Sequence, residues 1–228
     1  LDDFTAGKVG RAKLLVFLNA WILDGEQRAA IRKQGAGKTR FWCVAPGLMD
    51  GRRAAVENMT ALTGFAYRRL APLAERDKAR VRATPAGLAA GLEAEGECAS
   101  ADPLFAVTDA ATEEILATWP DGTAAVVMRR GAEGADIFCG IPLVPAALYR
   151  AAARVAGVHV YTDPDACHVC ANGPFVSLHA CRSGPVNVHL PQESVVFDAL
   201  SDEKLADGRE LTLRMEKGQT RVLRLAAP

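Results

Sequence analysis

The chain has 228 residues, half of them apolar, and its 27 basic side chains are balanced by 27 acidic ones. A chain of this length buries about 70% of the surface of its unfolded form, so a core can form without disulfides or metals. Zero net charge without a basic stripe argues against a nucleic-acid partner or an anionic membrane partner. The longest apolar runs, 14–18 and 123–128, are far shorter than the roughly 18 residues that span a bilayer. The composition therefore predicts a soluble globular protein.

Two further features of the composition narrow the class of protein. Aromatic residues make up only 6% of the chain, which argues against an aromatic-lined groove for single-stranded nucleic acid or stacked sugars. The six cysteines are too sparse for a disulfide-built scaffold. We expect reduced thiols, which favour a cytoplasmic location. The first residue, Leu1, is not a methionine, which leaves open tag removal, maturation or an origin within a longer polypeptide.

The first part of the chain alternates between apolar strands and a helix. Residues 13–18 predict a strand that is buried on both faces of a parallel sheet. Asp24 and Gln27 have the spacing of a capping box at the start of a helix. The apolar face of this helix is assigned to Ala29, Ala30 and Ile31. Residues 40–45 predict a second buried strand, so the first 45 residues contain a βαβ unit.

The middle of the chain has a less regular pattern. Residues 56–62 predict a short helix that ends at Gly64, whereas residues 68–96 are hard to assign. Further strands are predicted at residues 103–107, 123–128 and 136–141. Glycines in the turn at 131–134 predict that the last two strands form an antiparallel hairpin at one edge of the sheet. A helix over residues 144–156 is closed by Gly157, and residues 158–161 predict a strand that returns to the sheet.

Beyond Asp163 the pattern changes to short strands separated by turns. Residues 167–171 and 174–180 predict a hairpin with Asn172 and Gly173 in a type I′ turn. Further strands at 186–190, 194–198, 210–215 and 220–225 have the spacing of a small sandwich. We therefore expect an α/β domain over residues 1–163 and a small antiparallel β-sandwich over residues 164–228.

Chemistry in an α/β sheet is expected at the carboxyl ends of the parallel strands. The GAGKT segment at 35–39 resembles the end of a phosphate-binding loop, but it precedes a strand and lacks the upstream glycine. Cys43 lies inside a strand with no glycine before it, so we expect a core residue and not a nucleophile. Adjacent carboxylates such as Glu113 and Glu114 diverge in direction and make no acid/base pair. No catalytic residue and no cofactor are predicted.

A group of cysteine and histidine residues is the most unusual feature of the second half. Its candidate metal ligands are Cys167, Cys170, His179 and Cys181. A zinc site is one interpretation. However, a spacing of three places Cys167 and Cys170 on opposite faces of a strand. The Asn172-Gly173 turn would pair Cys170 with Phe175 and Cys167 with Leu178, so packing is the preferred interpretation.

Several segments together resemble a known group of enzymes. They are residues 13–51, which begin KLLVFLNAW, and residues 56–65, 156–165, 171–180 and 218–225. This series resembles the accessory C-terminal region of β-galactosidase-like glycoside hydrolases, with residues 68–101 the least similar part. In that group a catalytic barrel is followed by a flavodoxin-like domain, related to class I glutamine amidotransferases and called the trimerisation domain. A small β-sandwich follows it.

The resemblance implies an oligomer contact and not a catalytic site. The paired glutamates of such enzymes lie on the barrel, and the amidotransferase-like domain has lost its nucleophile. We therefore expect a non-catalytic accessory fragment that forms homo-oligomers through its α/β domain, with the catalytic barrel before Leu1. Two alternatives stay open. One is a stand-alone amidotransferase-like hydrolase that uses Cys43 or the cysteine and histidine group. The other is a sugar-binding module, in which Trp21 or Trp119 would contact carbohydrate if exposed, although Trp21 is expected to be partly buried.

Overall fold

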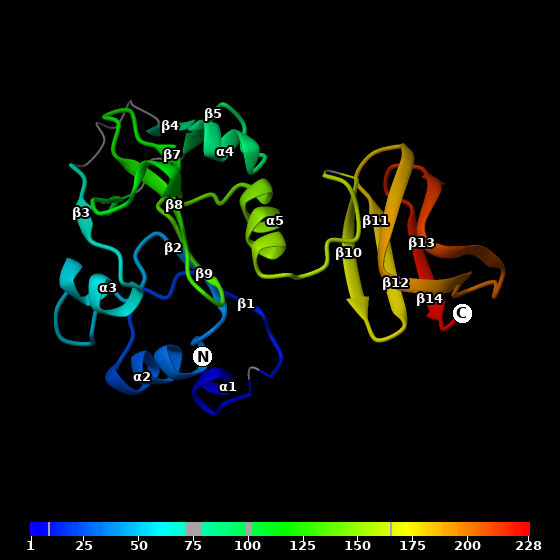
Figure 1. Cartoon of the computed structure of the whole chain (residues 1–228), viewed down its shortest axis with the longest axis horizontal. Helices are drawn as coiled ribbons and strands as arrows, with labels where there is room; N and C mark the ends of the chain where they lie inside the picture. The colour runs from blue at the N-terminus through cyan, green and yellow to red at the C-terminus, as the bar shows by residue number, and fades with distance from the viewer. Residues whose placement is uncertain (9, 72–78, 99–101, 165) are drawn as a thin grey trace. The chain divides into compact units, whose positions relative to one another are not determined.

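A computed structural model describes residues 1–8, 10–71, 79–98, 102–164 and 166–228 of the chain. These residues divide into two compact units, Leu1–Val158 and His159–Pro228, called unit 1 and unit 2. Figure 1 shows helices and a mixed sheet in unit 1 and strands alone in unit 2. The predicted mixed α/β part followed by a separate antiparallel sheet is confirmed, and no strand path in the described ranges closes into a barrel.

Unit 1 is built on a nine-stranded sheet. The strands are β1 (Leu14–Phe17), β2 (Thr39–Cys43), β3 (Tyr67–Arg69), β4 (Ala79–Ala83), β5 (Glu95–Cys98), β6 (Phe105–Val107), β7 (Ile115–Thr118), β8 (Ala124–Arg130) and β9 (Ala135–Cys139). The main path runs β1-β2-β9-β8-β7-β4-β5, while β6 pairs with β8 and with β3. Strands β1, β2 and β9 run parallel, and the remaining pairs are antiparallel.

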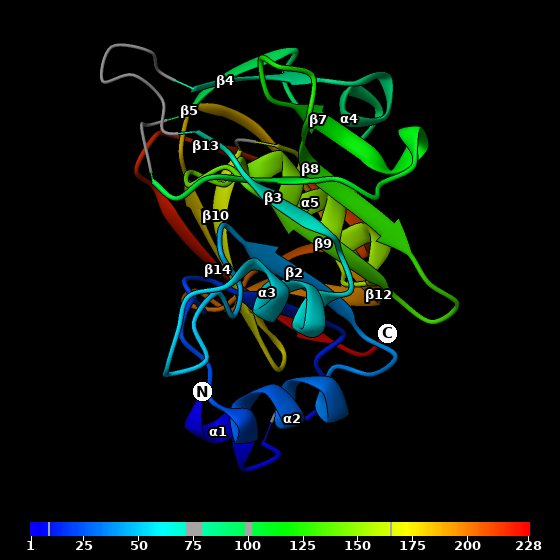
Figure 2. The ribbon, with the colours of Figure 1, turned by 90° about the vertical axis from the view of Figure 1, so that its left-hand side faces the viewer.

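Helices cover both faces of the parallel part of this sheet. They are α1 (Asp2–Thr5), α2 (Gly25–Gln34), α3 (Val56–Thr63), α4 (Pro85–Ala89) and α5 (Ala146–Val155), together with a short 3₁₀ turn, η1 (Thr112–Glu114). Figures 1 and 2 show α3 and α5 on opposite faces. Phe41 of β2 stacks on Tyr149 of α5, with ring centroids 5.3 Å apart. On the other face, Phe17 stacks on Trp42 at 4.5 Å and contacts Phe4 of α1.

The predicted βαβ unit is confirmed as β1-α2-β2. The Asp24 side chain accepts a hydrogen bond from Gln27 N at 2.8 Å, and Gln27 Oε1 accepts one from Asp24 N at 3.0 Å, which completes the capping box. The apolar face assigned to α2 needs correction, because Ala29 is exposed. The buried residues of the helix are Arg28 and Ile31.

Three other predictions about unit 1 need correction. Strand β1 is not buried on both faces, because it lies at the edge of the sheet and leaves Val16 39% exposed. The hairpin of β8 and β9 is confirmed, but it lies in the middle of the sheet, between β7 and β2. Residues 158–161 do not return to this sheet. Instead, Tyr161 O accepts a hydrogen bond of 2.8 Å from His189 N, and Thr162 forms a bridge with Val188 in unit 2.

Among residues 68–96, to which the sequence pattern assigns no element, those that the structure describes form part of β3, β4, α4 and part of β5. The helix predicted over residues 56–62 is confirmed as α3, with Gly64 at its end in the left-handed conformation (φ 82°). Such a φ suits glycine because it has no Cβ. No helix in the described ranges is long and apolar enough to cross a bilayer.

Unit 2 is a five-stranded antiparallel sheet. Its strands are β10 (Cys167–Asn172), β11 (Phe175–Ala180), β12 (Gly184–Asp198), β13 (Lys204–Met215) and β14 (Thr220–Ala226), in the order β10-β11-β14-β12-β13. The strands predicted at 186–190 and 194–198 are a single strand, β12, whose register with β13 shifts between His189 and Ser194. Its core includes Val176, Leu178, Val186, Val188 and Leu223.

The hairpin of β10 and β11 turns one residue later than predicted. Asn172 belongs to β10 and pairs with Phe175, so Gly173 and Pro174 form the two-residue turn. Gly173 has φ 57°, which suits the glycine at the first central position of a type II′ turn. The later turn shifts the pairing partner of each cysteine on β10 by two residues.

Candidate functional site

The carboxyl ends of β1 and β2 lie side by side at one edge of unit 1, and each ends in a sharp turn. Asn19 and Val44, which follow these strands, have positive φ angles of 51° and 59°. A hydrogen bond of 2.8 Å from Ala45 N to Cys43 O closes a three-residue turn around Val44. A matching bond of 2.8 Å joins Trp21 N to Asn19 O after β1. Turns of this kind reverse the chain within three residues.

Val44 is a strained position. A β-branched residue in the left-handed region costs on the order of 1–2 kcal/mol. Its side chain is buried, and its N–H donates to Cys139 O of β9 at 2.8 Å. A strained turn at the end of a strand is the geometry that presents a nucleophile in some α/β enzymes. Here the residue in the turn carries only an apolar isopropyl group.

Cys43, the cysteine nearest to this turn, lies inside β2 and is 3% exposed, so its predicted core position is confirmed. Burial raises the pKa of its thiol to about 12. The thiol is therefore protonated near neutral pH and is a poor nucleophile. Cys139, its register partner on β9, is also buried, and its thiol donates to Ile141 O at 3.6 Å.

A buried arginine organises the loop that follows β2. Arg28 Nε donates to Leu23 O at 2.9 Å, and Nη1 donates to Asn58 O at 2.9 Å. Nη2 donates to Gly47 O at 2.6 Å and to Met49 O at 3.1 Å. Desolvation lowers the pKa of Arg28 from its ordinary value. The guanidinium stays charged, because arginine is protonated throughout the physiological range.

The sequence pattern did not reveal Arg28, although its spacing of three from Ile31 places both on one face of α2. Gly47 is required for the arginine to fit. It has φ 64°, and a Cβ there would lie 2.8 Å from Leu62 Cδ2 and 3.0 Å from Arg28 Nη1. Arg28 is therefore a structural residue that fixes α2, α3 and the loop after β2 in one arrangement.

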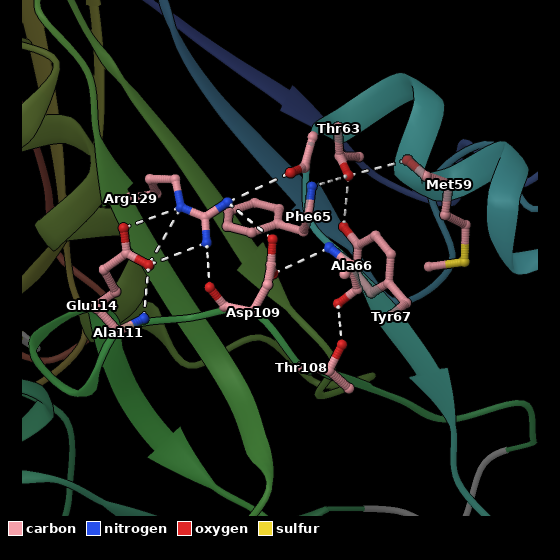
Figure 3. Close-up of polar contacts among 11 residues, drawn as sticks. Met59, Thr63, Phe65, Ala66, Tyr67, Thr108, Asp109, Ala111, Glu114 and Arg129 are labelled. Carbon is pink, nitrogen blue, oxygen red and sulfur yellow. Dashed lines mark hydrogen bonds and ion pairs between the residues drawn. The ribbon is translucent and has the colours of Figure 1, made fainter.

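A second arginine joins the elements around β8 (Figure 3). Arg129 Nε donates to both carboxylate oxygens of Glu114, at 3.0 and 3.2 Å. Nη2 donates to Glu114 Oε2 at 3.1 Å and to Asp109 O at 3.0 Å, and Nη1 lies 3.5 Å from Asp109 Oδ2. The guanidinium carbon lies 4.7 Å from the centre of the Phe65 ring. Hydrogen bonds to Glu114 raise the pKa of Arg129 above its ordinary value.

Figure 3 shows further hydrogen bonds next to Arg129, on the side of Phe65. Asp109 Oδ1 accepts from Ala66 N at 3.0 Å. Thr63 Oγ1 donates to Met59 O at 3.0 Å and lies 2.8 Å from the Tyr67 hydroxyl. Because all three nitrogens of Arg129 are engaged, this network holds loops in place and offers no free group to a substrate.

The candidate metal ligands of unit 2 are not gathered around one point. Cys167 pairs with Ala180, and Cys170 pairs with Ser177, whereas the sequence predicted Leu178 and Phe175 as their partners. Cys170 is exposed, while Cys167 is buried, and burial raises the pKa of the Cys167 thiol. His179 Nδ1 lies 2.9 Å from Thr220 Oγ1, and Cys181 Sγ lies 3.9 Å from His179 O. Across the described ranges, no three His, Cys, Asp or Glu side chains are grouped to hold a metal ion.

The two tryptophans proposed for sugar contact differ in exposure. Trp119 is 3% exposed and donates from its indole nitrogen to Phe105 O at 3.1 Å, so its ring is not at the surface. Trp21 packs against the core and is partly buried, as expected. Its indole nitrogen is buried without a hydrogen-bond partner. Trp119 therefore presents no open ring face, whereas Trp21 keeps part of its surface exposed.

Two partly buried carboxylates of unit 1 are already engaged. Asp136 accepts two hydrogen bonds from Arg40, at 2.8 and 2.6 Å, and one from Trp42 Nε1 at 3.0 Å. Glu114 is held by Arg129 and also accepts from Ala111 N at 3.1 Å. Carboxylates held in this way support the fold and do not resemble an acid/base pair.

Exposed apolar side chains are the feature that remains at the carboxyl ends of the parallel strands. Leu18 follows β1, Ile22 lies in the next loop, and Leu143 follows β9, and they are 57%, 61% and 68% exposed. Ile22 also forms a bridge with Met49, which follows β2. This edge therefore offers exposed apolar surface, of the kind that interaction surfaces present.

Comparison with known proteins shows that this chain has a fold similar to part of several longer enzymes. No protein-family model and no curated protein matches the sequence. Among solved structures, the β-galactosidase from Bacillus circulans sp. alkalophilus matches with a TM-score of 0.66 and 13% identity, over 94% of this chain and 33% of that one. The cold-adapted β-galactosidase from Rahnella sp. R3 matches with a TM-score of 0.65 and 18% identity, over 94% and 32%.

A GH42 β-galactosidase from G. stearothermophilus gives a TM-score of 0.63 at 17% identity, over 95% of this chain and 32% of that one. At these identities the comparison shows a shared fold. The chain spans about a third of the length of these enzymes, and both units are included in the match.

Proposed function

We propose that residues 1–228 are a non-catalytic accessory region of a β-galactosidase-like glycoside hydrolase whose catalytic barrel is not in this chain. The observation that carries the proposal is the edge where β1, β2 and β9 end. It keeps a strained turn of the kind that presents a nucleophile, but the turn holds Val44. The neighbouring thiol, Cys43, is buried and has a pKa raised to about 12.

The fold shared with a third of the length of the GH42 β-galactosidases supports this proposal. In it, the α/β region predicted over residues 1–163 is a flavodoxin-like, amidotransferase-like domain that holds contacts between copies of the enzyme. The region over residues 164–228 is the small β-sandwich. The exposed apolar side chains of unit 1 supply the surface that such contacts need.

The direct test is to mix the purified chain with aryl galactosides and measure release of the aryl group. We expect no turnover above the buffer control, while an intact GH42 β-galactosidase in the same assay confirms that the substrate is hydrolysed. Turnover by the chain, lost in a Cys43→Ala variant, would instead support the hydrolase alternative.

Labelling with iodoacetamide tests the same point without a substrate. We expect Cys43 and Cys139 to react only after unfolding, because both thiols are buried, whereas the exposed Cys170 reacts in the native protein. A single thiol that reacts much faster than free cysteine at neutral pH would contradict the non-catalytic proposal.

A further inference from the structure

A cavity lies at the amino ends of β1 and β2, at the opposite end of these strands from Val44. It has a volume of about 300 Å³ and is lined by residues 11–13 and 37–39, by Glu133, and by Val155 and Ala156 at the end of α5. Residues 37–39 complete the GAGKT sequence, which the proposed function does not use. A volume of this size is at the lower limit of cavities that hold small molecules.

Thr39 is a buried polar residue in the wall of this cavity. It is 1% exposed, and its Oγ1 forms no hydrogen bond with a described residue. Its side chain shares a face of β2 with Phe41, because residues two apart in a strand point to the same side. Phe41 stacks on Tyr149 of α5, so Thr39 is directed toward α5, whose last residues line the cavity. A buried hydroxyl group without a partner is unfavourable, and a hydrogen bond to a ligand in the cavity would remove this cost.

The charged side chains that line the cavity are mostly basic. They are Arg11, Lys13, Lys38 and Glu133, so three positive charges stand against one negative charge. None of the four forms an ion pair with a described residue. A concave surface with an uncompensated excess of positive charge attracts anions.

The two lysines are held at the cavity by one hydrogen bond each. Lys13 Nζ donates to Gly157 O, just after α5, at 3.1 Å, and Lys38 Nζ donates to Ala12 O at 2.5 Å. An ammonium group has three N–H donors, so each lysine keeps two for a ligand. The bond to Gly157 O also places a positive charge at the negative end of the α5 dipole, which would otherwise disfavour an anion.

We infer that this cavity binds a phosphate group, carried by inorganic phosphate or by a small phosphate monoester. Lys13, Lys38 and Arg11 neutralise its charge, and Thr39 Oγ1 donates to one of its oxygens. The excess of two positive charges in the lining matches the charge of about −2 that a phosphate monoester carries at pH 7. The site differs from a phosphate-binding loop, because it precedes β2 and uses side chains in place of a helix N-terminus.

Isothermal titration calorimetry of the 228-residue chain tests this site. The probes are inorganic phosphate, glucose 6-phosphate and glucose, at constant ionic strength. We expect both phosphate compounds to bind, one per chain, and glucose not to bind. Tighter binding of glucose 6-phosphate supports a monoester as the ligand, and tighter binding of inorganic phosphate supports the free ion.

Three variants test whether the phosphate occupies this cavity. Lys38→Met should weaken phosphate binding by about tenfold or more, because it removes a charged donor. Glu133→Gln should strengthen binding, because it removes the carboxylate from the lining. Lys33→Met is the matched control, since Lys33 is exposed on α2 and does not line the cavity. Circular dichroism establishes that each variant is folded.

Thr39→Val tests the hydroxyl group separately. Valine keeps the shape of threonine and removes a hydroxyl group without a partner, so stability in phosphate-free buffer should be unchanged or higher. Phosphate binding should weaken by about threefold or more, because one donor is lost. Phosphate should therefore raise the melting temperature of the wild type more than that of Thr39→Val.

The results that overturn the inference are specific to it. One is that neither phosphate compound binds at millimolar concentrations. Another is that Lys38→Met and Lys33→Met weaken binding equally, which would show attraction to surface charge alone. The site does not depend on the proposed accessory role, so neither result changes the interpretation of the turnover assay.

Discussion

Two regions of unit 1 are each held by one arginine. The two arginines differ in burial and in the groups that accept their hydrogen bonds. Arg28, beside the parallel strands, is buried, and its hydrogen bonds go to backbone carbonyl groups. Arg129, in the antiparallel part, has a side chain 31% exposed and is bound by the carboxylates of Glu114 and Asp109 and by the ring of Phe65. The first region is therefore stabilised by neutral acceptors, and the second by ionised groups that salt can screen.

The largest effect is expected from Arg28→Met. The substitution removes the donor for four carbonyl groups, and we expect it to lower the free energy of unfolding by about 3–5 kcal/mol. Urea denaturation measures the loss. Arg32→Met is the matched control, because Arg32 is exposed on the same helix and should change stability by less than about 0.5 kcal/mol. Equal losses in the two variants would mean that Arg28 does not hold this region.

Arg129→Met should cost less, about 1–2 kcal/mol, because the network is partly exposed. The cost should shrink in high salt, since screening already weakens the ion pairs of the wild type. Denaturation at low and high salt checks this, with Glu114→Gln as a second variant. If the cost of Arg28→Met changes with salt as much as that of Arg129→Met, the contrast between the two regions is wrong.

Alkaline pH should weaken the parallel region through Cys43. Burial raises the pKa of this thiol from 9.0 to about 12, so between these values the folded state holds a proton that the unfolded state releases. Stability must therefore fall as pH rises through this window. Cys43→Ala should make the fall shallower, although it lowers stability at neutral pH by leaving a cavity.

Tyr67→Phe tests whether ionisation of Tyr67 also contributes to the loss of stability at alkaline pH. Burial also raises the pKa of Tyr67, whose ordinary value is 10.0, so its effect begins at higher pH than that of Cys43. Thermal melts of both variants from pH 8 upward would show whether either group accounts for the loss. An alkaline profile identical to that of the wild type in both variants would contradict this assignment.

The smallest effect is expected from Asp50→Ala, in the loop that Arg28 holds. Hydrogen bonds from the backbone N–H groups of Arg53 and Arg52 lower the pKa of Asp50. A lowered carboxyl pKa gives stability that is present above the ordinary value and lost as pH falls through the lowered one. Asp50→Ala should lose this small pH-dependent contribution to stability. Asp50→Asn keeps an acceptor oxygen, so its stability at neutral pH should fall less. Melts between pH 2 and 6 compare them.

Local sequence signals predicted the elements that need only neighbouring residues. The capping box of α2 depends on two side chains three positions apart, Asp24 and Gln27, and it formed as expected. Gly64 ends α3 because only the local backbone must adopt a positive φ. The hairpin of β8 and β9 was likewise visible, because two apolar runs flank a glycine-containing turn.

Features decided by partners distant in the sequence were not predictable. Strand β4 has the sequence ARVRA, and its arginines give no local signal for a strand. It forms a strand because β5 and β7 pair with it. The turn at Gly173 and Pro174 replaced the expected Asn172-Gly173 turn. The expected turn would pair Ala171 with Pro174, and proline has no backbone N–H to donate to the hairpin. The pattern of residues 13–18 showed an apolar strand but not that it lies at an edge.

The features of the candidate site also separate into those that neighbouring residues determine and those that distant residues determine. The core position of Cys43 followed from its place within an apolar strand. The strained turn at Val44 could not be predicted, because β-branched residues favour extended backbone over the left-handed region. The role of Arg28 also depends on carbonyl groups that lie up to 30 residues away in the sequence.

The turn at Val44 also bears on how unit 1 opens locally. Residues 44–50 are held by Arg28 and by separate backbone hydrogen bonds, such as those from Gly47 N to Ala20 O and from Met49 N to Trp21 O, and not by a continuous ladder. The strain at Val44 favours their release. Segments of this kind open at a lower free energy than the whole fold. We expect the amides of this loop to exchange by local opening, ahead of those in β2 and β9. The edge where many α/β proteins carry out chemistry would then be, in this protein, the part of the parallel sheet that opens first.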